Sequence, residues 1–200
     1  MVIIVAIPFS MALSILTIYL KVVEFIKGVK GKMMPNITFE FNRTKAIEAI
    51  LYLANNLNDP GKYVICKLLY LADKCSLEQY GRFIFGDSYS AMREGATPSS
   101  AYDLLKEAAK TPVNGISVQG NRVIPLRKPD LDYLSKSDVE CLEQIINTPS
   151  WRMRRDTHDD AWQKSWDNRG NKGSAKIPIE HIAKLFTNSD DLIDHLSNVG

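Results

Sequence analysis

The feature that most constrains the fold is an apolar helical pattern over residues 62–80, bounded by Gly61 and Gly81. Its apolar side chains recur three and four residues apart and cover much of the helix circumference. A helix of this kind must be covered by other elements on several sides, so we expect it in the middle of a domain. Gly81 follows at the point where a glycine can adopt the left-handed conformation that ends many helices.

The stretch after this helix has the pattern of turns followed by another helix. Gly86-Asp87 is a dipeptide typical of turns, and we expect residues 89–97 to form an irregular loop. Ser99 or Ser100 is expected to cap a helix over residues 100–110, because a serine hydroxyl can accept a hydrogen bond from a free amide of the first turn.

The rest of the chain is also expected to be mainly helical. Further helices are predicted over 44–57, from a capping box at Ser137–Glu140 through Ile146, over 159–166, over 179–186 with Pro178 as its first residue, and over 189–196. Residues 116–124 predict a small hairpin with Gly120 or Asn121 at positive φ. The predicted fold class is therefore mainly α: one compact helical domain over 34–200 with a minor β-hairpin, preceded by a hydrophobic N-terminal helix.

Several short motifs follow one another between residues 67 and 105. They are Lys67-Leu68-Leu69-Tyr70, Ala72-Asp73, Tyr80-Gly81, Gly86-Asp87, Tyr89, Ala91-Met92, Gly95, Pro98-Ser99 and Tyr102-Asp103-Leu104-Leu105. In this order they resemble the Panacea domain of SocA-like antitoxins, often labelled phage-associated proteins, over about residues 44–110 and more weakly to about residue 195. The chain departs from the family pattern at Ala96, where the family usually has a proline.

The resemblance implies a function based on binding. Such a protein is expected to be the antitoxin of a toxin–antitoxin system, which binds and neutralises a cognate protein toxin. Some relatives act as adaptors that hand a bound toxin to a cytoplasmic protease. The resemblance therefore implies no enzyme activity and no cofactor. The alternative is a membrane-tethered or phage-encoded regulatory adaptor that binds proteins without a toxin.

The distribution of charge does not favour a nucleic-acid partner. Residues 1–32 hold four lysines and one glutamate, so 21 of the 25 basic and 22 of the 23 acidic residues lie beyond them. A non-specific nucleic-acid binder more often has a basic excess. Arg152, Arg154 and Arg155 follow Trp151 and could grip phosphate or stack on bases, but such a short run is more often a solvated helix end. We expect no nucleic acid as partner.

The first 32 residues form a hydrophobic segment with three interpretations. Residues 1–20 contain no charged side chain, and as a helix they would span ~30 Å, the thickness of a bilayer's hydrocarbon core. The lysines that follow would keep the domain in the cytoplasm, anchored to the inner membrane. Alternatively, Met33 or Met34 is the native start and residues 1–32 are an extension, or the segment is buried in protein.

One short sequence has the composition of a catalytic or metal site. His158, Asp159 and Asp160 combine an imidazole with two carboxylates, which can bind a metal or relay protons. Thr157 as a helix N-cap, with two aspartates in the first turn, explains the same residues through the helix dipole. No recognised nucleophile motif accompanies them. We therefore expect neither a catalytic site nor a metal site.

The candidate partner-binding residues lie in two groups. Tyr89, Met92 and Arg93 belong to types enriched at protein interfaces and lie on the expected loop before Pro98. Trp162 and Trp166 are four residues apart on one helical face, where an aromatic pair anchors either a core or an interface. We expect at least one of the two tryptophans to be part of the core.

Overall fold

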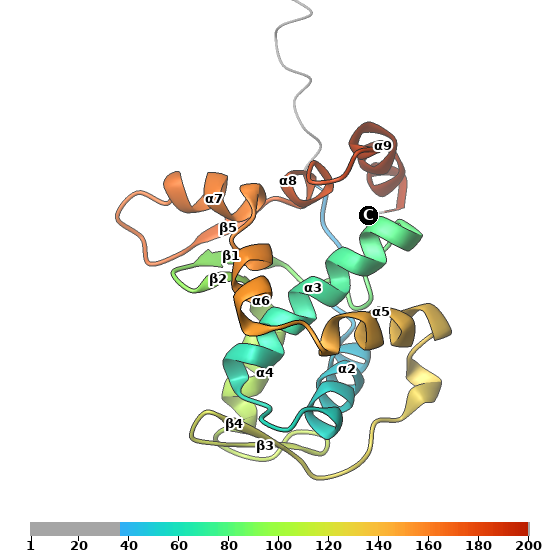
Figure 1. Ribbon diagram of the computed structural model, residues 1–200, viewed down its shortest axis with the longest axis vertical. Helices are drawn as coiled ribbons and strands as arrows, with labels where there is room; N and C mark the ends of the chain where they lie inside the picture. The colour runs from blue at the N-terminus through green and yellow to red at the C-terminus, as the bar shows by residue number, and fades with distance from the viewer. Residues whose placement is uncertain (1–36, 200) are drawn as a thin grey trace, which may run out of the picture. The chain divides into compact units, whose positions relative to one another are not determined.

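The computed structural model describes residues 37–199, in which the other elements surround the long helix α3 (Lys62–Tyr80; Figure 1). The remaining elements are α2 (Arg43–Asn56), β1 (Tyr89–Met92), β2 (Gly95–Pro98), α4 (Ser99–Ala108), β3 (Ile116–Gln119), β4 (Arg122–Pro125), the 3-10 helix η1 (Leu131–Tyr133), α5 (Lys136–Ile146), α6 (Ser150–Thr157), α7 (Asp160–Asp167), β5 (Ala175–Ile177), α8 (Ile179–Ala183) and α9 (Ser189–Val199). Helix α3 contacts α2, α4, α5, α6 and β2. Every residue from Ile65 to Asp73 is buried, which confirms the predicted central position of this helix.

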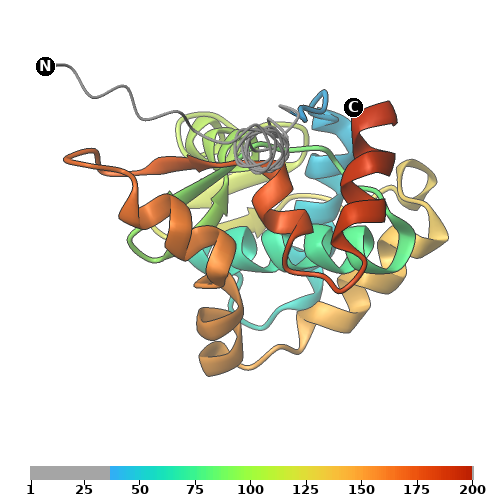
Figure 2. The ribbon, with the colours of Figure 1, turned by 90° about the horizontal axis from the view of Figure 1, so that it is seen from above.

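A small antiparallel sheet, which the sequence did not predict, lies beside α3. Its strand order is β2-β1-β5, and Tyr89 of β1 pairs with Pro98 on one side and with Ile177 on the other. Strand β5 follows α7 along the chain and returns to this sheet (Figure 2). The expectation of an irregular loop over 89–97 is therefore wrong. Strands of three or four residues are stabilised by their partners, and one partner here is far away in sequence.

The predicted fold class is confirmed in its main part, since the described residues are mainly α-helical. Gly81 ends α3 at φ 65°, and Gly120 has φ 59° in the turn of the β3–β4 hairpin, both as predicted. Helix α8 differs from the prediction at both ends. Pro178 is its N-cap rather than its first helical residue, and the helix ends at Ala183 rather than near residue 186.

Two predicted helix caps are displaced by two residues. The capping box of α5 consists of Ser135 and Asp138, and not of Ser137–Glu140. Helix α7 is capped by Asp159, whose side chain accepts a hydrogen bond from the backbone N–H of Trp162. Thr157 is the last residue of α6. Serine, threonine and aspartate all make good caps. A run of such residues therefore marks a helix start without singling out the residue that caps it.

Helix α4 is capped by a side chain that lies before β1. The buried Asp87 carboxylate accepts hydrogen bonds from the backbone N–H groups of Ser100 at 2.9 Å and Ala101 at 2.8 Å. It also accepts one from Ser88 at 2.7 Å. The prediction that Ser99 or Ser100 caps this helix is wrong, because a carboxylate at the positive end of the helix dipole takes that role. Asp87 thereby ties the entrance of β1 to the start of α4.

A second buried carboxylate, Asp73 of α3, fixes the segment that leads to β1. It accepts a hydrogen bond from the backbone N–H of Ile84 at 2.7 Å and another from the Tyr89 hydroxyl. Burial raises the pKa of Asp73 to about 7, although these two hydrogen bonds oppose the shift. Asp73 and Asp87 both belong to the series of short motifs between residues 67 and 105, here called the recognised motif. Both carboxylates accept hydrogen bonds from backbone N–H groups and so hold the backbone in place.

The predicted N-terminal segment, residues 1–32 with the charge-free stretch 1–20, lies outside the described residues. Its interpretation as an anchor, an extension or a buried helix remains a prediction. Within residues 37–199, no helix is both long and apolar enough to cross a membrane.

Replacing Asp87 by alanine should lower the free energy of unfolding by about 1–3 kcal/mol, because α4 loses its cap and buried amides lose their acceptor. Denaturation in urea, followed by circular dichroism, measures the change. The control is Asp103→Ala in the same helix, where the carboxylate is exposed and paired with Lys106. Its effect should stay within about 0.5 kcal/mol. Equal losses in both variants would contradict the capping role of Asp87.

Asp73→Asn should remove a specific part of the pH dependence of stability. In the unfolded chain Asp73 ionises near its ordinary pKa of 3.8, whereas in the folded protein it ionises at about 7. Between these values the folded state binds the extra proton, so this group makes the free energy of unfolding fall as pH rises from 4 to 7, by at most about 4 kcal/mol. Urea denaturation at pH 4.5 and 7.5 should show a smaller fall in Asp73→Asn. Equal pH dependence in both proteins would contradict the raised pKa.

Candidate partner-binding site

A buried lysine of α3 donates hydrogen bonds to the residues that follow the turn between β1 and β2. The Lys67 ammonium donates hydrogen bonds to the carbonyl oxygens of Gly95 at 2.9 Å and Ala96 at 2.8 Å, and to the Thr97 hydroxyl at 3.0 Å. Lys67 is almost fully buried in α3. An ammonium has three donors, and these three acceptors use all of them. The lysine therefore fixes the strand that leaves the turn.

The other side of the same turn is held by side chains of the α6–α7 segment. The Trp162 indole N–H donates to the carbonyl oxygen of Met92 at 2.7 Å. The His158 ring has Nε2 at 3.4 Å from the carbonyl oxygen of Arg93 and Nδ1 at 2.7 Å from that of Arg154. Carbonyl groups on both sides of the turn are thus in contact with polar side chains from α3 and from the α6–α7 segment. The backbone of the turn is therefore held by contacts within the chain itself.

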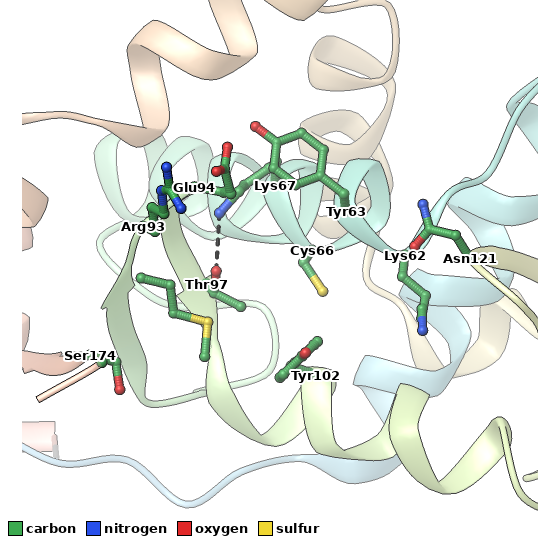
Figure 3. A pocket seen from close by; sticks show the side chains of 12 residues that line it. Lys62, Tyr63, Cys66, Lys67, Arg93, Glu94, Thr97, Tyr102, Asn121 and Ser174 are labelled. Carbon is green, nitrogen blue, oxygen red and sulfur yellow. Dashed lines mark hydrogen bonds between the residues drawn. The ribbon is translucent and has the colours of Figure 1, made fainter.

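A cavity of about 610 Å³ lies between α3, the turn and α4 (Figure 3). Cys66 and Lys67 line it from α3 and Tyr102 lines it from α4. Burial raises the pKa of the Cys66 thiol to about 12 and lowers the pKa of Lys67 to about 8. A thiol that is protonated at neutral pH is a poor nucleophile. At neutral pH the thiol and the ammonium are both mainly protonated, so both groups are poor nucleophiles.

The side chains at the tip of the turn face solvent. Arg93 and Glu94 are exposed, and Figure 3 shows them on one rim of the cavity, near Tyr63. Burial raises the pKa of the Tyr63 hydroxyl, the Glu94 charge raises it further, and the Arg154 charge opposes the rise. These influences place Glu94 and Arg154 near Tyr63. The turn therefore presents charges of both signs beside an aromatic ring.

The structure separates the predicted partner-binding residues into buried and accessible groups. Tyr89 is 1% exposed and bonded to Asp73, so its expected place on an exposed loop is wrong. Met92 is half-buried in the cavity wall, and Arg93 is exposed at the tip. Whether Met92 and Arg93 contact a partner remains a prediction.

The two tryptophans of α7 stack on each other. Their ring centroids lie 5.6 Å apart with an interplanar angle of 13°, and Trp162 is 7% exposed. Trp166 is half-buried, and the Arg169 guanidinium lies 3.6 Å from its ring centroid. Trp162 belongs to the core, as expected for at least one of the pair. Trp166 presents only part of its surface to a partner.

The predicted acid and histidine cluster is used to hold helices together. Asp159 accepts hydrogen bonds from the Tyr70 hydroxyl at 2.8 Å and the Lys74 ammonium at 2.6 Å, and it caps α7. His158 lies against backbone carbonyls, and Asp160 is exposed. Within residues 37–199, no group of three or more His, Cys, Asp or Glu side chains is arranged to hold a metal ion. Asp159 thus fastens α7 to α3.

Sequence reasoning did not assign roles to Lys67, Tyr63 and Glu94, and it interpreted Arg154 as part of a solvated helix end. The signal for Lys67 was its position within an otherwise apolar helical stripe, which requires a buried ammonium to find acceptors. No comparable signal existed for Tyr63 and Glu94, and the signal at Arg154 was only its neighbouring tryptophan and arginines. They come together only because α3, the turn and α6 pack against one another.

Lys67→Met should loosen the turn while keeping the apolar stem of the side chain. Two carbonyl groups and a hydroxyl would lose their donor, which makes local opening easier by about 1–3 kcal/mol. Hydrogen exchange measured by mass spectrometry should accelerate about tenfold or more over residues 89–97. Lys62→Met, on the wall of the same cavity, serves as control because it leaves these acceptors paired. Unchanged exchange in Lys67→Met would show that the turn is held by other contacts.

The elements around this turn match a known protein family. Residues 65–163 match the family described as antitoxin SocA-like, Panacea domain. No curated protein and no solved structure matches the chain. The match begins in α3 and ends in α7, so it includes the held turn and the elements that hold it on both sides. The predicted resemblance is confirmed, since residues 65–163 form a domain of the antitoxin SocA-like, Panacea domain family.

Proposed function

We propose that this protein is an antitoxin that binds a cognate protein toxin directly and neutralises it, without making or breaking covalent bonds. The proposal is carried by the turn between β1 and β2, whose backbone is held on both sides while Arg93 and Glu94 remain exposed. A surface that is ordered before binding loses little conformational entropy when a partner docks. The family match supports a toxin as this partner.

Neutralisation would follow from occlusion of the toxin's working surface. A helical scaffold of this kind binds as a rigid body, since pre-organised interfaces change little between the free and bound states. The turn and the neighbouring face of α6 would cover the toxin, and the energy of binding would come from a few aromatic and arginine side chains. No step of this mechanism requires a cofactor or a nucleophile.

Delivery of the bound toxin to a cytoplasmic protease is the second form of this proposal. Both forms need the same complex, but they differ in the fate of the toxin. With occlusion alone the toxin stays at its original level in the cell, whereas delivery shortens its lifetime. The lifetime of the toxin therefore distinguishes between the two forms.

Co-expression tests the proposed function. The product of the neighbouring reading frame, expressed alone from an inducible promoter, should arrest growth, and simultaneous expression of the full-length chain should restore it. A copy of the gene with an early stop codon is the control. Immunoblotting of the tagged toxin after translation is blocked then gives its lifetime in the presence and absence of the chain.

Two results would contradict the antitoxin assignment. One is that the neighbouring product is harmless by itself. The other is that it remains toxic although the chain accumulates in folded form. In either case, a regulatory adaptor without a toxin becomes the better interpretation.

A further inference from the structure

The outward face of α6 carries an exposed tryptophan among arginines. Trp151 is 66% exposed, and Arg154 and Arg155 follow it three and four residues later, on the same face of the helix. Met153 and Thr157 are buried on the opposite face. Tryptophan and arginine are the side chains most enriched among the energetic hot spots of protein interfaces. This face therefore has the composition of an interface without a partner among the described residues.

The arginines of this face keep an excess of positive charge. The Arg155 guanidinium lies 5.4 Å from the centroid of the Trp151 ring and 2.7 Å from the Asp156 carboxylate. Arg152 pairs with the same carboxylate at 3.3 Å. One carboxylate is thus shared by two arginines. Arg154 adds another exposed cation.

The face of α6 is continuous with the tip of the β1–β2 turn. His158 bridges the two, because its ring lies against the carbonyl oxygens of both Arg154 and Arg93. The electrostatic influence of Arg154 and Glu94 on Tyr63 places their charges close to the same ring. The exposed side chains of Arg93, Trp151, Arg154 and Arg155 are here called the basic-aromatic surface.

The charge of this surface differs from that of the protein around it. The 21 basic and 22 acidic residues beyond residue 32 nearly balance, so the cluster of arginines is local. A local cationic patch favours a partner with negative charge. Glu94 and Asp156 interrupt the patch and would repel the continuous phosphates of a nucleic acid. An acidic protein segment, which can place its carboxylates selectively, fits this mixed pattern better.

We propose that the basic-aromatic surface binds an acidic segment of the partner protein. Trp151 packs on an apolar side chain of that segment, while Arg154 and Arg93 pair with its carboxylates. The inference rests on the proposed function, since the toxin is the protein that supplies the segment. It goes further by naming the contact surface and the chemistry of the toxin that it recognises.

Two variants of the full-length chain test this surface. Arg154→Glu reverses an exposed charge, and Trp151→Ala removes the exposed ring. Lys128→Glu and Tyr133→Ala are the matched controls, because both residues are exposed on the segment that ends in η1, which contacts α2. Circular dichroism and thermal unfolding are the checks that all four variants fold. The probe is the product of the neighbouring reading frame, titrated calorimetrically at low and high salt.

Each test variant should bind the probe about 30-fold more weakly than wild type, while the controls stay within about twofold. Arg154→Glu should also reduce the salt dependence of binding. Replacing a carboxylate of the probe by arginine should restore affinity to Arg154→Glu but not to Trp151→Ala. Such a rescue shows that Arg154 contacts an acidic residue directly.

The contrary outcomes are distinct from one another. If wild type binds and both test variants bind equally well, the surface is wrong while the antitoxin function stands. If wild type does not bind, the proposed function and the surface both fail. If wild type binds a labelled RNA or duplex DNA and Arg154→Glu does not, the result would contradict the proposal that the partner is a protein. A wild-type dimer that becomes monomeric in Arg154→Glu would assign the surface to a second copy of the chain.

Discussion

The arrangement of the described domain depends on the buried ammonium of Lys67. Burying a cation is costly unless hydrogen bonds replace its lost hydration, and here three oxygen atoms without formal charge provide them. These acceptors belong to three consecutive residues of β2. A shift of the strand by a single residue would therefore move the Thr97 hydroxyl away from the ammonium. The lysine fixes the register between α3 and the sheet as well as their proximity.

Three polar residues of the recognised motif share a structural role. Lys67 holds the turn, Asp73 holds the segment before β1, and Asp87 caps α4. All three side chains are buried and hydrogen-bonded to backbone groups. The exposed side chains that we assign to partner binding, such as Trp151 and Arg154, lie outside the motif. The motif therefore identifies the scaffold, whereas the surface that we propose for partner binding consists of residues outside it.

Sequence reasoning found the helices because their apolar residues repeat locally. It missed the three-stranded sheet because each strand is very short and Tyr89 pairs with the distant Ile177. The same cause explains why Tyr89 was expected on an exposed loop. Helix caps were misplaced where several suitable side chains follow one another, as between Thr157 and Asp160. The candidate site was found only in part, since Met92 and Arg93 have interface-type side chains while Tyr63 joins them through packing alone.

The position of β5 in the chain has a consequence for synthesis on the ribosome. Residues 175–177 emerge long after the β1–β2 hairpin, and until then the other edge of β1 has unpaired backbone groups. Open strand edges are templates for association with other chains. Every newly made molecule therefore passes through an interval in which its central strand is unprotected. Until residues 175–177 pair with β1, association with another chain competes with folding at this edge.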